Sequence, residues 1–280
     1  MATPCAAATA DHESLDRLLA GGPRHVLLDS TRTGGQLAMS RLAAPAGTAS
    51  SVHPHAGEDE IFVMMRGSGI FWAGDQRFEL GEGGVAFLPC GVPHGYRITS
   101  DADLLALSTP GSPGLAPYAA GADQHETLEW LDGGLVRILL SEERTGGRLS
   151  LFRSTAPAGS ASPVYVHGKE DEIVVMLSGS GIYWVGEHRY ELSAGGMVFV
   201  PRGVTTAHRI TTDAEKLTVT TPGGLEAFLR KVCRDVSQPR PAGWRISFDA
   251  MVRAAEATGQ TILVAPLQAD DASSAPLVAA

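Results

Sequence analysis

An internal repeat constrains the fold of this chain more than any other feature, because the same pattern occurs twice at an offset of 112 residues. Residues 67–92 read GSGIFWAGDQRFELGEGGVAFLPCGV, and residues 179–204 read GSGIYWVGEHRYELSAGGMVFVPRGV without a gap. Self-similarity at a fixed offset indicates two copies of one structural unit. We therefore expect an N-terminal domain over residues 1–115 and a C-terminal domain over residues 116–280, joined at the glycine- and proline-rich segment 111–121.

Within each copy the apolar segments are short and are separated by glycine and proline turns. The first copy contains HVLLD, QLAMSRLA, IFVMM, GIFWAG, QRFEL and VAFLP in succession. Short apolar runs bounded by turn residues predict β-strands, and several of them in a row predict a sandwich or a barrel. The 33 glycines and 17 prolines agree with an all-β fold rich in tight turns.

Helices are expected mainly at the edges of the repeat. Apolar residues mark one face of a helix over residues 225–232, and Ser247 is placed to cap a second helix that ends at Thr258. The segment TILVAP then predicts a last strand, and residues 13–20 predict a short helix near the start.

The charge and the cysteine content narrow the choice of partner and compartment. A net charge of -9 and a pI near 5.4 argue against a nucleic acid or an anionic membrane, so a small molecule is the expected partner. The three cysteines are far apart and form no CxxC pair, and no segment approaches the length of a membrane span. We expect a soluble protein of the reducing cytoplasm.

The residues most suggestive of chemistry lie in the stretch SVHPHAGEDEIFVMMRG, residues 51–67. On an extended strand, His53 and His55 point to the same face roughly 6.5 to 7 Å apart, and a turn would bring Glu60 beside them. Two imidazoles and one carboxylate suit a divalent transition metal. His94 follows a turn 34 residues after Glu60 and is a fourth candidate ligand, because it can return on a neighbouring strand.

Two other acids precede Glu60 and compete with it as ligands. Glu58 and Asp59 have the repeat partners Glu170 and Asp171. We interpret these repeated acids as a turn exposed to solvent in both copies, and Glu60 is therefore the preferred ligand.

Neighbouring side chains extend the candidate site. Alternation along a strand places Phe62 and Met64 on the face of Glu60, where they should line the pocket, although core packing alone would also explain them. Tyr96 shares the face of His94, so its phenol is a candidate hydrogen-bond donor to a substrate.

The spacing of these residues resembles that of the cupin superfamily. The first motif runs His53, Pro54, His55, four residues, Glu60, six residues and Gly67, and the second runs Gly83, five residues, Pro89, Cys90, Gly91, two residues and His94. With the duplication, the resemblance covers roughly residues 25–222 and extends to the bicupins, which include flavonol (quercetin-type) dioxygenases.

This resemblance implies two tandem jelly-roll β-barrels with short flanking helices. It also implies that one divalent ion, of Fe, Mn, Ni, Co, Cu or Zn, is bound by His53, His55, Glu60 and His94. Such barrels commonly pair, so a homodimer is expected. Three nitrogens and one oxygen leave about two positions of an octahedral ion open, as catalysis requires.

The second copy lacks half of the ligand set, because Tyr165 and Thr206 stand where His53 and His94 stand in the first. Three interpretations remain open: a vestigial barrel, a second small-molecule pocket, or an improvised metal site. The improvised site would consist of Tyr165, His167, Glu172 and His208. We expect one working metal site per chain, in the first copy.

The leading functional hypothesis is a metal-dependent dioxygenase that acts on a small enol- or phenol-bearing molecule together with dioxygen. The substrate oxygen would bind the ion, and Glu60 would accept its proton. An isomerase, cyclase or epimerase could use the same ion without oxygen. A non-catalytic bicupin that binds or stores a small molecule is the third alternative.

Overall fold

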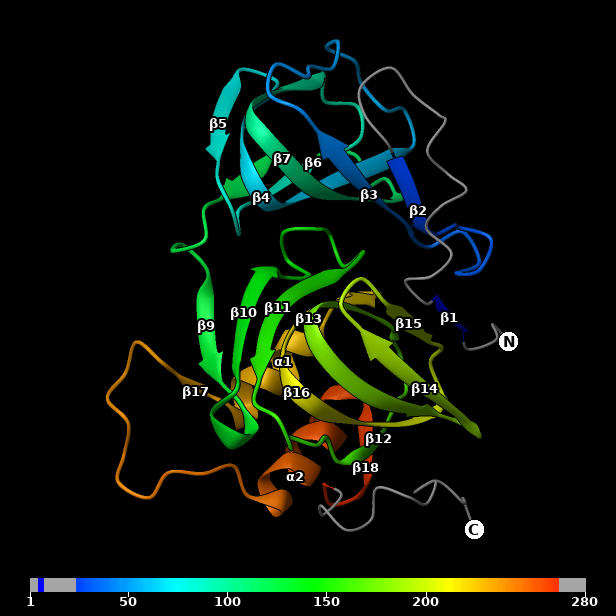
Figure 1. The fold of residues 1–280 in the computed structure, drawn as a ribbon, viewed down its shortest axis with the longest axis vertical. Coiled ribbons are helices and arrows are strands. Elements are labelled where there is room, and N and C mark those ends of the chain that lie inside the picture. The colour runs from blue at the N-terminus through cyan, green and yellow to red at the C-terminus, as the bar shows by residue number, and fades with distance from the viewer. Residues whose placement is uncertain (1–4, 8–23, 267–280) are drawn as a thin grey trace.

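Two β-barrels, one above the other in Figure 1, make up the computed structural model, which describes residues 5–7 and 24–266. Strands dominate both barrels, and the α-helices of the described residues lie near the C-terminus. The predicted all-β fold with two tandem barrels is thereby confirmed. The helix expected over residues 13–20 lies outside the described residues.

The N-terminal barrel is a seven-stranded antiparallel sheet in the order β2-β3-β7-β4-β6-β8, with β5 added to β4. Its strands are β2 (Arg24–Leu28), β3 (Ala38–Ala44), β4 (Glu58–Ala73), β5 (Gln76–Leu80), β6 (Val85–Leu88), β7 (His94–Pro110) and β8 (Tyr118–Ala120).

The C-terminal barrel repeats this arrangement and adds to it. Its strands are β9 (Glu126–Glu129), β10 (Leu135–Leu140), β11 (Ser150–Ala156), β12 (Val164–His167), β13 (Asp171–Val185), β14 (His188–Ser193), β15 (Met197–Val200) and β16 (Thr205–Thr221). A short 3-10 helix, η2 (Leu131–Gly133), joins β9 to β10. The later elements are α1 (Leu225–Val232), β17 (Arg234–Asp235), α2 (Phe248–Thr258) and β18 (Gln260–Val264).

The longest strands bend so that each serves both halves of its barrel. The pairing of β4 with β7 shifts register between Met64 and Gly69, which marks the bend. Gly67 lies there with φ 85°, and a Cβ at this position would come within 2.3 Å of the carbonyl oxygen of Asp101. Glycine is therefore required at this motif position.

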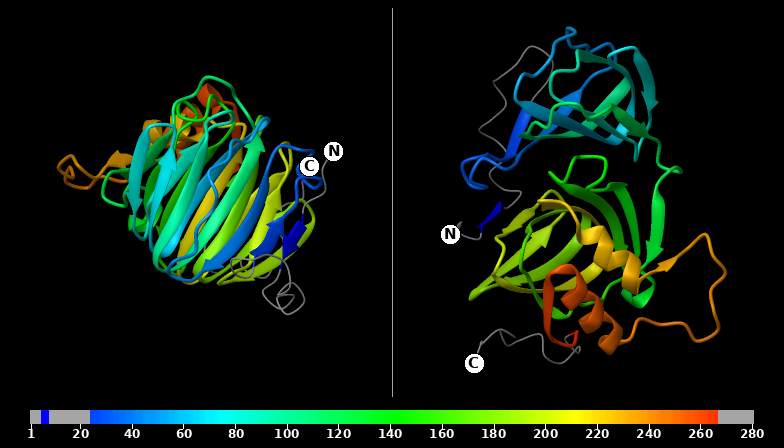
Figure 2. Two further views of the ribbon diagram at one scale, coloured as in Figure 1. Left: turned by 90° about the horizontal axis from the view of Figure 1, so that it is seen from above. Right: turned by 180° about the vertical axis from the view of Figure 1, so that it is seen from behind.

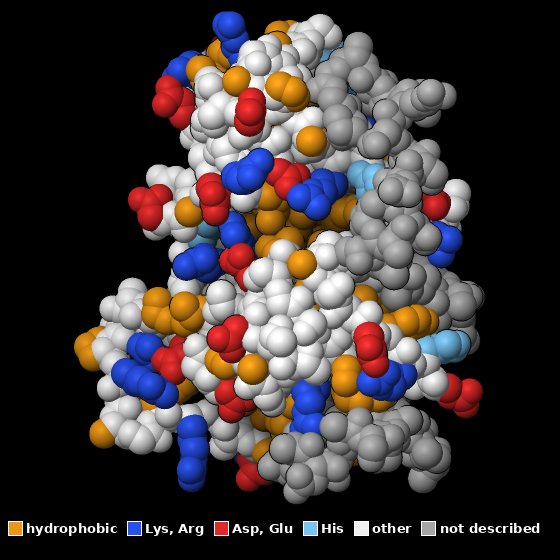
Figure 3. Space-filling model, viewed as in Figure 1, with side chains coloured by type: hydrophobic (Ala, Val, Ile, Leu, Met, Phe, Trp, Pro, Cys, Tyr) orange, Lys and Arg blue, Asp and Glu red, His pale blue; other side chains and the backbone are white. Residues whose placement is uncertain are grey.

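A shared apolar core joins the two barrels. Along β4, Ile61 and Val63 face this core, whereas Phe62 and Met64 face the barrel interior. The core is built from equivalent positions of the two copies, as in a two-fold interface. The equivalent pairs are Leu28 and Leu140, Leu37 and Leu149, Met39 and Leu151, Ile61 and Ile173, Val63 and Val175, Val85 and Met197, Phe87 and Phe199, Leu105 and Leu217, and Leu107 and Val219. In Figure 3, charged side chains surround a hydrophobic patch between the barrels.

Short strands cross between the two copies. Strand β8 lies beyond residue 115, yet it pairs with β6 of the N-terminal barrel. Strand β1 (Cys5–Ala7) precedes the first copy and pairs with β15 of the C-terminal barrel. The domain boundary at residues 115 and 116 stays a prediction, and the pairing shows that each barrel is completed by a strand from outside its own repeat.

The C-terminal helices and the last strand form where the sequence predicts them. The hydroxyl of Ser247 accepts a hydrogen bond from the amide of Ala250 at 3.2 Å, and α2 ends at Gly259 with φ 92°. Strand β18 pairs with β12, and the helices lie against the outer side of the C-terminal barrel (Figure 2). None of the helices in the described part of the chain is long and apolar enough to cross a membrane.

Candidate metal centre

Three histidines converge at one end of the N-terminal barrel. The ring centroids of His53, His55 and His94 lie 4.9 to 5.2 Å apart, and one nitrogen of each lies within 4.8 Å of the others. The two predicted motifs therefore meet in space, although they are separated by most of β4, β5 and β6.

Backbone hydrogen bonds hold the two motifs side by side. His53 and His94 form an isolated antiparallel bridge, in which each amide donates to the other's carbonyl at 2.9 and 3.0 Å. The amide of Gly91 donates to the carbonyl of His55 at 2.8 Å. The main chain thus holds the strands that carry the imidazoles side by side.

The prediction of a solvated acidic turn was wrong for three of its four residues. Glu58 is exposed, but Asp59, Glu170 and Asp171 are buried. The carboxylate of Asp59 accepts a hydrogen bond from the amide of Cys90 at 2.8 Å, in the loop that leads to His94. This acid therefore fixes the second motif against the first, because a buried carboxylate needs hydrogen-bond donors.

The histidine side chains are oriented to present their Nε2 atoms. Nδ1 of His53 donates to the carbonyl of Ser51 at 2.8 Å, and Nδ1 of His94 donates to the carbonyl of Val92 at 2.9 Å. These bonds leave Nε2 with a free lone pair. The Nε2 atoms of His55 and His94 are buried and make no hydrogen bond. Imidazole nitrogens left in this way fit a divalent transition metal.

Glu60 supplies the carboxylate next to these nitrogens. Its Oε2 atom lies 3.3 Å from Nε2 of His94 and 3.8 Å from Nε2 of His55. Burial alone would lower the pKa of His94, but the Glu60 carboxylate and the Val92 carbonyl outweigh it and raise this pKa. The side chains of His55 and Glu60 are 34% and 23% exposed, so a ligand can reach an ion there from the barrel mouth.

The other predicted pocket residues lie just inside the barrel. Phe62 and Met64 belong to its buried interior, and the ring of Phe62 lies 5.4 Å from that of Tyr96. Burial and the negative charge of Glu60 raise the pKa of Tyr96, so its phenol keeps its proton and can donate a hydrogen bond.

In the second copy, three of the four residues of the suggested improvised site meet. The phenol of Tyr165 donates to Oε2 of Glu172 at 2.7 Å, and Nε2 of His167 lies 3.5 Å from the same oxygen. His208 instead faces Lys216, whose ammonium donates to Nε2 of His208 at 3.2 Å. A cation already lies against this imidazole, which does not favour a metal there.

Sequence reasoning missed Lys216, although the repeat contains the signal. Its counterpart in the first copy is Leu104, a buried residue of the barrel interior, and Lys216 itself is only 8% exposed. A lysine that replaces a core leucine in an otherwise matched strand is unusual, because a buried charge is costly.

Because of Lys216, the stability of the protein should change with pH in the alkaline range. Burial lowers its pKa from 10.5 to about 8, only partly opposed by the charge of Glu172. Between pH 8 and pH 10.5, Lys216 is mostly protonated in the unfolded chain and mostly neutral in the folded chain. The free energy of unfolding therefore rises with pH over this range. Relative to Lys216→Met, the wild type should be less stable below pH 8 and should recover by about pH 10.5. Thermal unfolding of both proteins across this range measures the difference, and a constant gap would contradict the prediction.

Comparisons with known proteins agree with this geometry. Residues 41–110 and 152–221 both match the family described as "Cupin domain". An oxalate-binding protein of Thermotoga maritima is 30% identical over 69 residues, which are 25% of this chain and 57% of that protein. An uncharacterized protein of Aquifex aeolicus is 37% identical over 68 residues, 24% of this chain and 56% of that protein. The matched region thus spans little more than half the length of these relatives.

Solved structures resemble the whole two-barrel arrangement. A single-residue mutant of Bacillus subtilis oxalate decarboxylase superposes with a TM-score of 0.65 at 16% identity, covering 78% of this chain and 77% of that one. The protein Ylba from E. coli has a TM-score of 0.65 at 15% identity, covering 79% of this chain and 91% of that one. At these identities the likeness concerns the fold. Together with the two matched segments, it places this chain in the cupin family, as a protein with two cupin domains in tandem.

Proposed function

We propose that the chain is a metal-dependent dioxygenase that acts on a small enol- or phenol-type molecule at its N-terminal barrel. One observation carries the proposal: the Nε2 atoms of His55 and His94 are buried without a hydrogen bond and face the carboxylate of Glu60, at a barrel mouth open to solvent. Four protein ligands would close a tetrahedral structural site, whereas around an octahedral ion three histidines and one carboxylate would leave two positions for substrate and oxygen.

The residues around the site have distinct roles in this proposal. A divalent ion there would supply a Lewis acid that favours the deprotonated form of a bound enol or phenol. The Glu60 carboxylate accepts the substrate proton, because it lies at the mouth and next to the imidazoles. The Tyr96 phenol donates a hydrogen bond to the substrate from inside the barrel, and Phe62 packs beside it and excludes water.

A second candidate is a non-oxidative reaction on a small carboxylate or enolate. The relative from Thermotoga maritima is named an oxalate-binding protein, which favours a small carboxylate as the ligand of this chain. An isomerase, cyclase or epimerase would need the same ion and the same base.

Oxygen consumption separates these candidates. Purified protein loaded in turn with Fe(II), Mn(II), Ni(II) or Co(II) would be mixed with flavonols, enediols and oxalate, in air and under argon. We expect substrate loss in air with matching uptake of dioxygen, and none under argon. Equal turnover under argon would establish the non-oxidative alternative, and inactivity with every metal and substrate would contradict both.

A further inference from the structure

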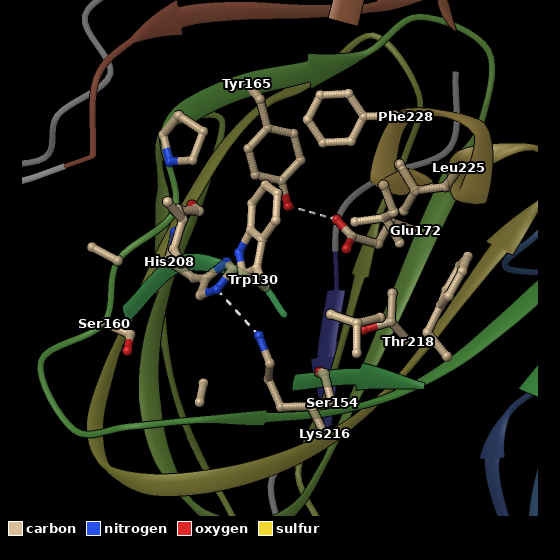
Figure 4. Close-up of a pocket in the computed structure, with 18 of the residues that line it drawn as sticks. Trp130, Ser154, Ser160, Tyr165, Glu172, His208, Lys216, Thr218, Leu225 and Phe228 are labelled. Carbon is tan, nitrogen blue, oxygen red and sulfur yellow. Dashed lines mark hydrogen bonds between the residues drawn. The ribbon is translucent and has the colours of Figure 1, made fainter. Parts of the chain in front are cut away.

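The C-terminal barrel contains a cavity of about 140 Å³ (Figure 4). Two of the lining residues are more polar than their counterparts in the first copy, Ser154 in place of Leu42 and Lys216 in place of Leu104. At these positions the first barrel has larger apolar side chains than the second. A cavity of this size can hold a ligand as large as benzene, or about six to eight non-hydrogen atoms.

One side of the cavity is polar. Figure 4 shows Lys216, His208 and Ser160 on the side away from Phe228 and Leu225. The hydroxyl of Ser160 and Nδ1 of His208 are buried and have no hydrogen-bond partner. Donors left free in a buried, partly apolar cavity indicate a ligand that accepts hydrogen bonds.

The charge of Lys216 is not neutralised by direct contact. Its ammonium is bound to the neutral Nε2 of His208, and it forms no ion pair with any carboxylate of the described residues. An ammonium has three donors, and a buried cation is costly unless an anion accompanies it. An anion bound at this end of the cavity would therefore be stabilised by the ammonium of Lys216.

The acids near the cavity already have partners of their own. Glu172 accepts from Tyr165 and lies 3.5 Å from Nε2 of His167. Glu170 accepts from the amide nitrogen of Gln260 at 3.2 Å and lies 3.8 Å from Nδ1 of His167. Both carboxylates contact His167, so the negative charge of Glu172 acts on Lys216 only from a distance and leaves the donors of its ammonium available.

Most of the opposite side is apolar and is made largely by the C-terminal extension, with the hydrogen-bonded pair of Tyr165 and Glu172 beside it (Figure 4). The lining residues there are Trp130, Phe152, Leu225, Phe228, Leu229 and Ile262. Helix α1 and strand β18 cover this barrel, and no described element does the same for the N-terminal one. The cavity thus joins one cationic end to one apolar end.

We infer that the C-terminal barrel is a metal-free binding site for a small monocarboxylate with a short apolar tail, whose carboxylate pairs with Lys216 and whose tail packs against α1. This site is separate from the proposed catalytic centre and does not depend on its metal. In the second copy, Tyr165 and Thr206 replace two of the metal ligands, and Lys216 replaces the core residue Leu104.

Calorimetric titration with butyrate, valerate and isovalerate tests the inference on the full chain. We expect binding of one anion per chain to the wild type and unchanged binding to a His94→Ala variant, which lacks a ligand of the first site. Lys216→Met should weaken binding about 10- to 100-fold, because a charge-assisted hydrogen bond is lost. Isovaleramide, the neutral isostere of isovalerate, should bind the wild type as weakly as isovalerate binds Lys216→Met.

Other results would overturn the inference. If none of the three anions binds at millimolar concentration, or if Lys216→Met binds isovalerate like the wild type, the cavity is not an anion site. Binding that disappears only in His94→Ala would assign the anion to the first barrel. Thermal unfolding of Lys216→Met serves as a fold control, since replacing a buried charge by an apolar side chain of similar volume should stabilise the protein.

Discussion

Replacing His94 by alanine is expected to remove both the bound metal and the turnover. The side chain is 2% exposed, and its Nε2 atom makes no hydrogen bond and lies 3.3 Å from the carboxylate of Glu60. Losing one of four ligands should weaken metal binding by at least about 100-fold, more than the loss of a hydrogen-bond partner of a ligand would. Elemental analysis after dialysis, together with the oxygen-uptake assay, measures both losses.

Thr206→Ala is the matched control for this variant, because Thr206 occupies the place of His94 in the second copy. Its hydroxyl donates to the carbonyl of Val204 at 3.3 Å and has no part in the first barrel. Metal content and turnover should stay at the wild-type level. Normal metal content in His94→Ala would show that the three histidines do not form the site.

Truncation of Phe87 or Phe199 to alanine should have the largest effect on stability. The two residues are repeat equivalents, both are fully buried, and both belong to the core shared by the barrels. Removing a buried phenylalanine costs about 3 to 5 kcal/mol in free energy of unfolding. Because the core draws equally on both copies, each variant should shift one common unfolding transition in calorimetry.

Phe248→Ala provides the comparison, since this phenylalanine is 37% exposed at the start of α2 and lies outside the shared core. It should cost less than about 1 kcal/mol. Two separate transitions, with Phe87→Ala affecting only one of them, would show that the barrels fold independently.

The architecture could be predicted because it depends on local and repeated patterns. The alternation along β4 and the cap at Ser247 each involve only a few neighbouring residues. The 112-residue repeat is found by aligning the chain with itself. The spacing of the two motifs predicts that His53, His55 and His94 lie close together, and in the structure the three rings do so.

What the sequence did not reveal depends on long-range burial. Asp59 was expected in solvent because acids usually are, but the loop at Cys90 folds over it and uses its carboxylate. Lys216 was overlooked because a charged side chain usually predicts exposure, although its strand faces the barrel interior as that of its counterpart Leu104 does. Both cases concern charged residues whose surroundings are set by segments distant in the chain.

Divergence of the two cupin copies, into a metal site in the first and a metal-free cavity in the second, is tested most directly by counting metal ions. The measurement is the number of ions per chain in protein purified without chelators and saturated with Mn(II), Fe(II), Ni(II) or Co(II). We expect one divalent ion per chain in the wild type, one in a His167→Ala variant and none in His94→Ala. Two ions per chain, with one lost in His167→Ala, would contradict this divergence.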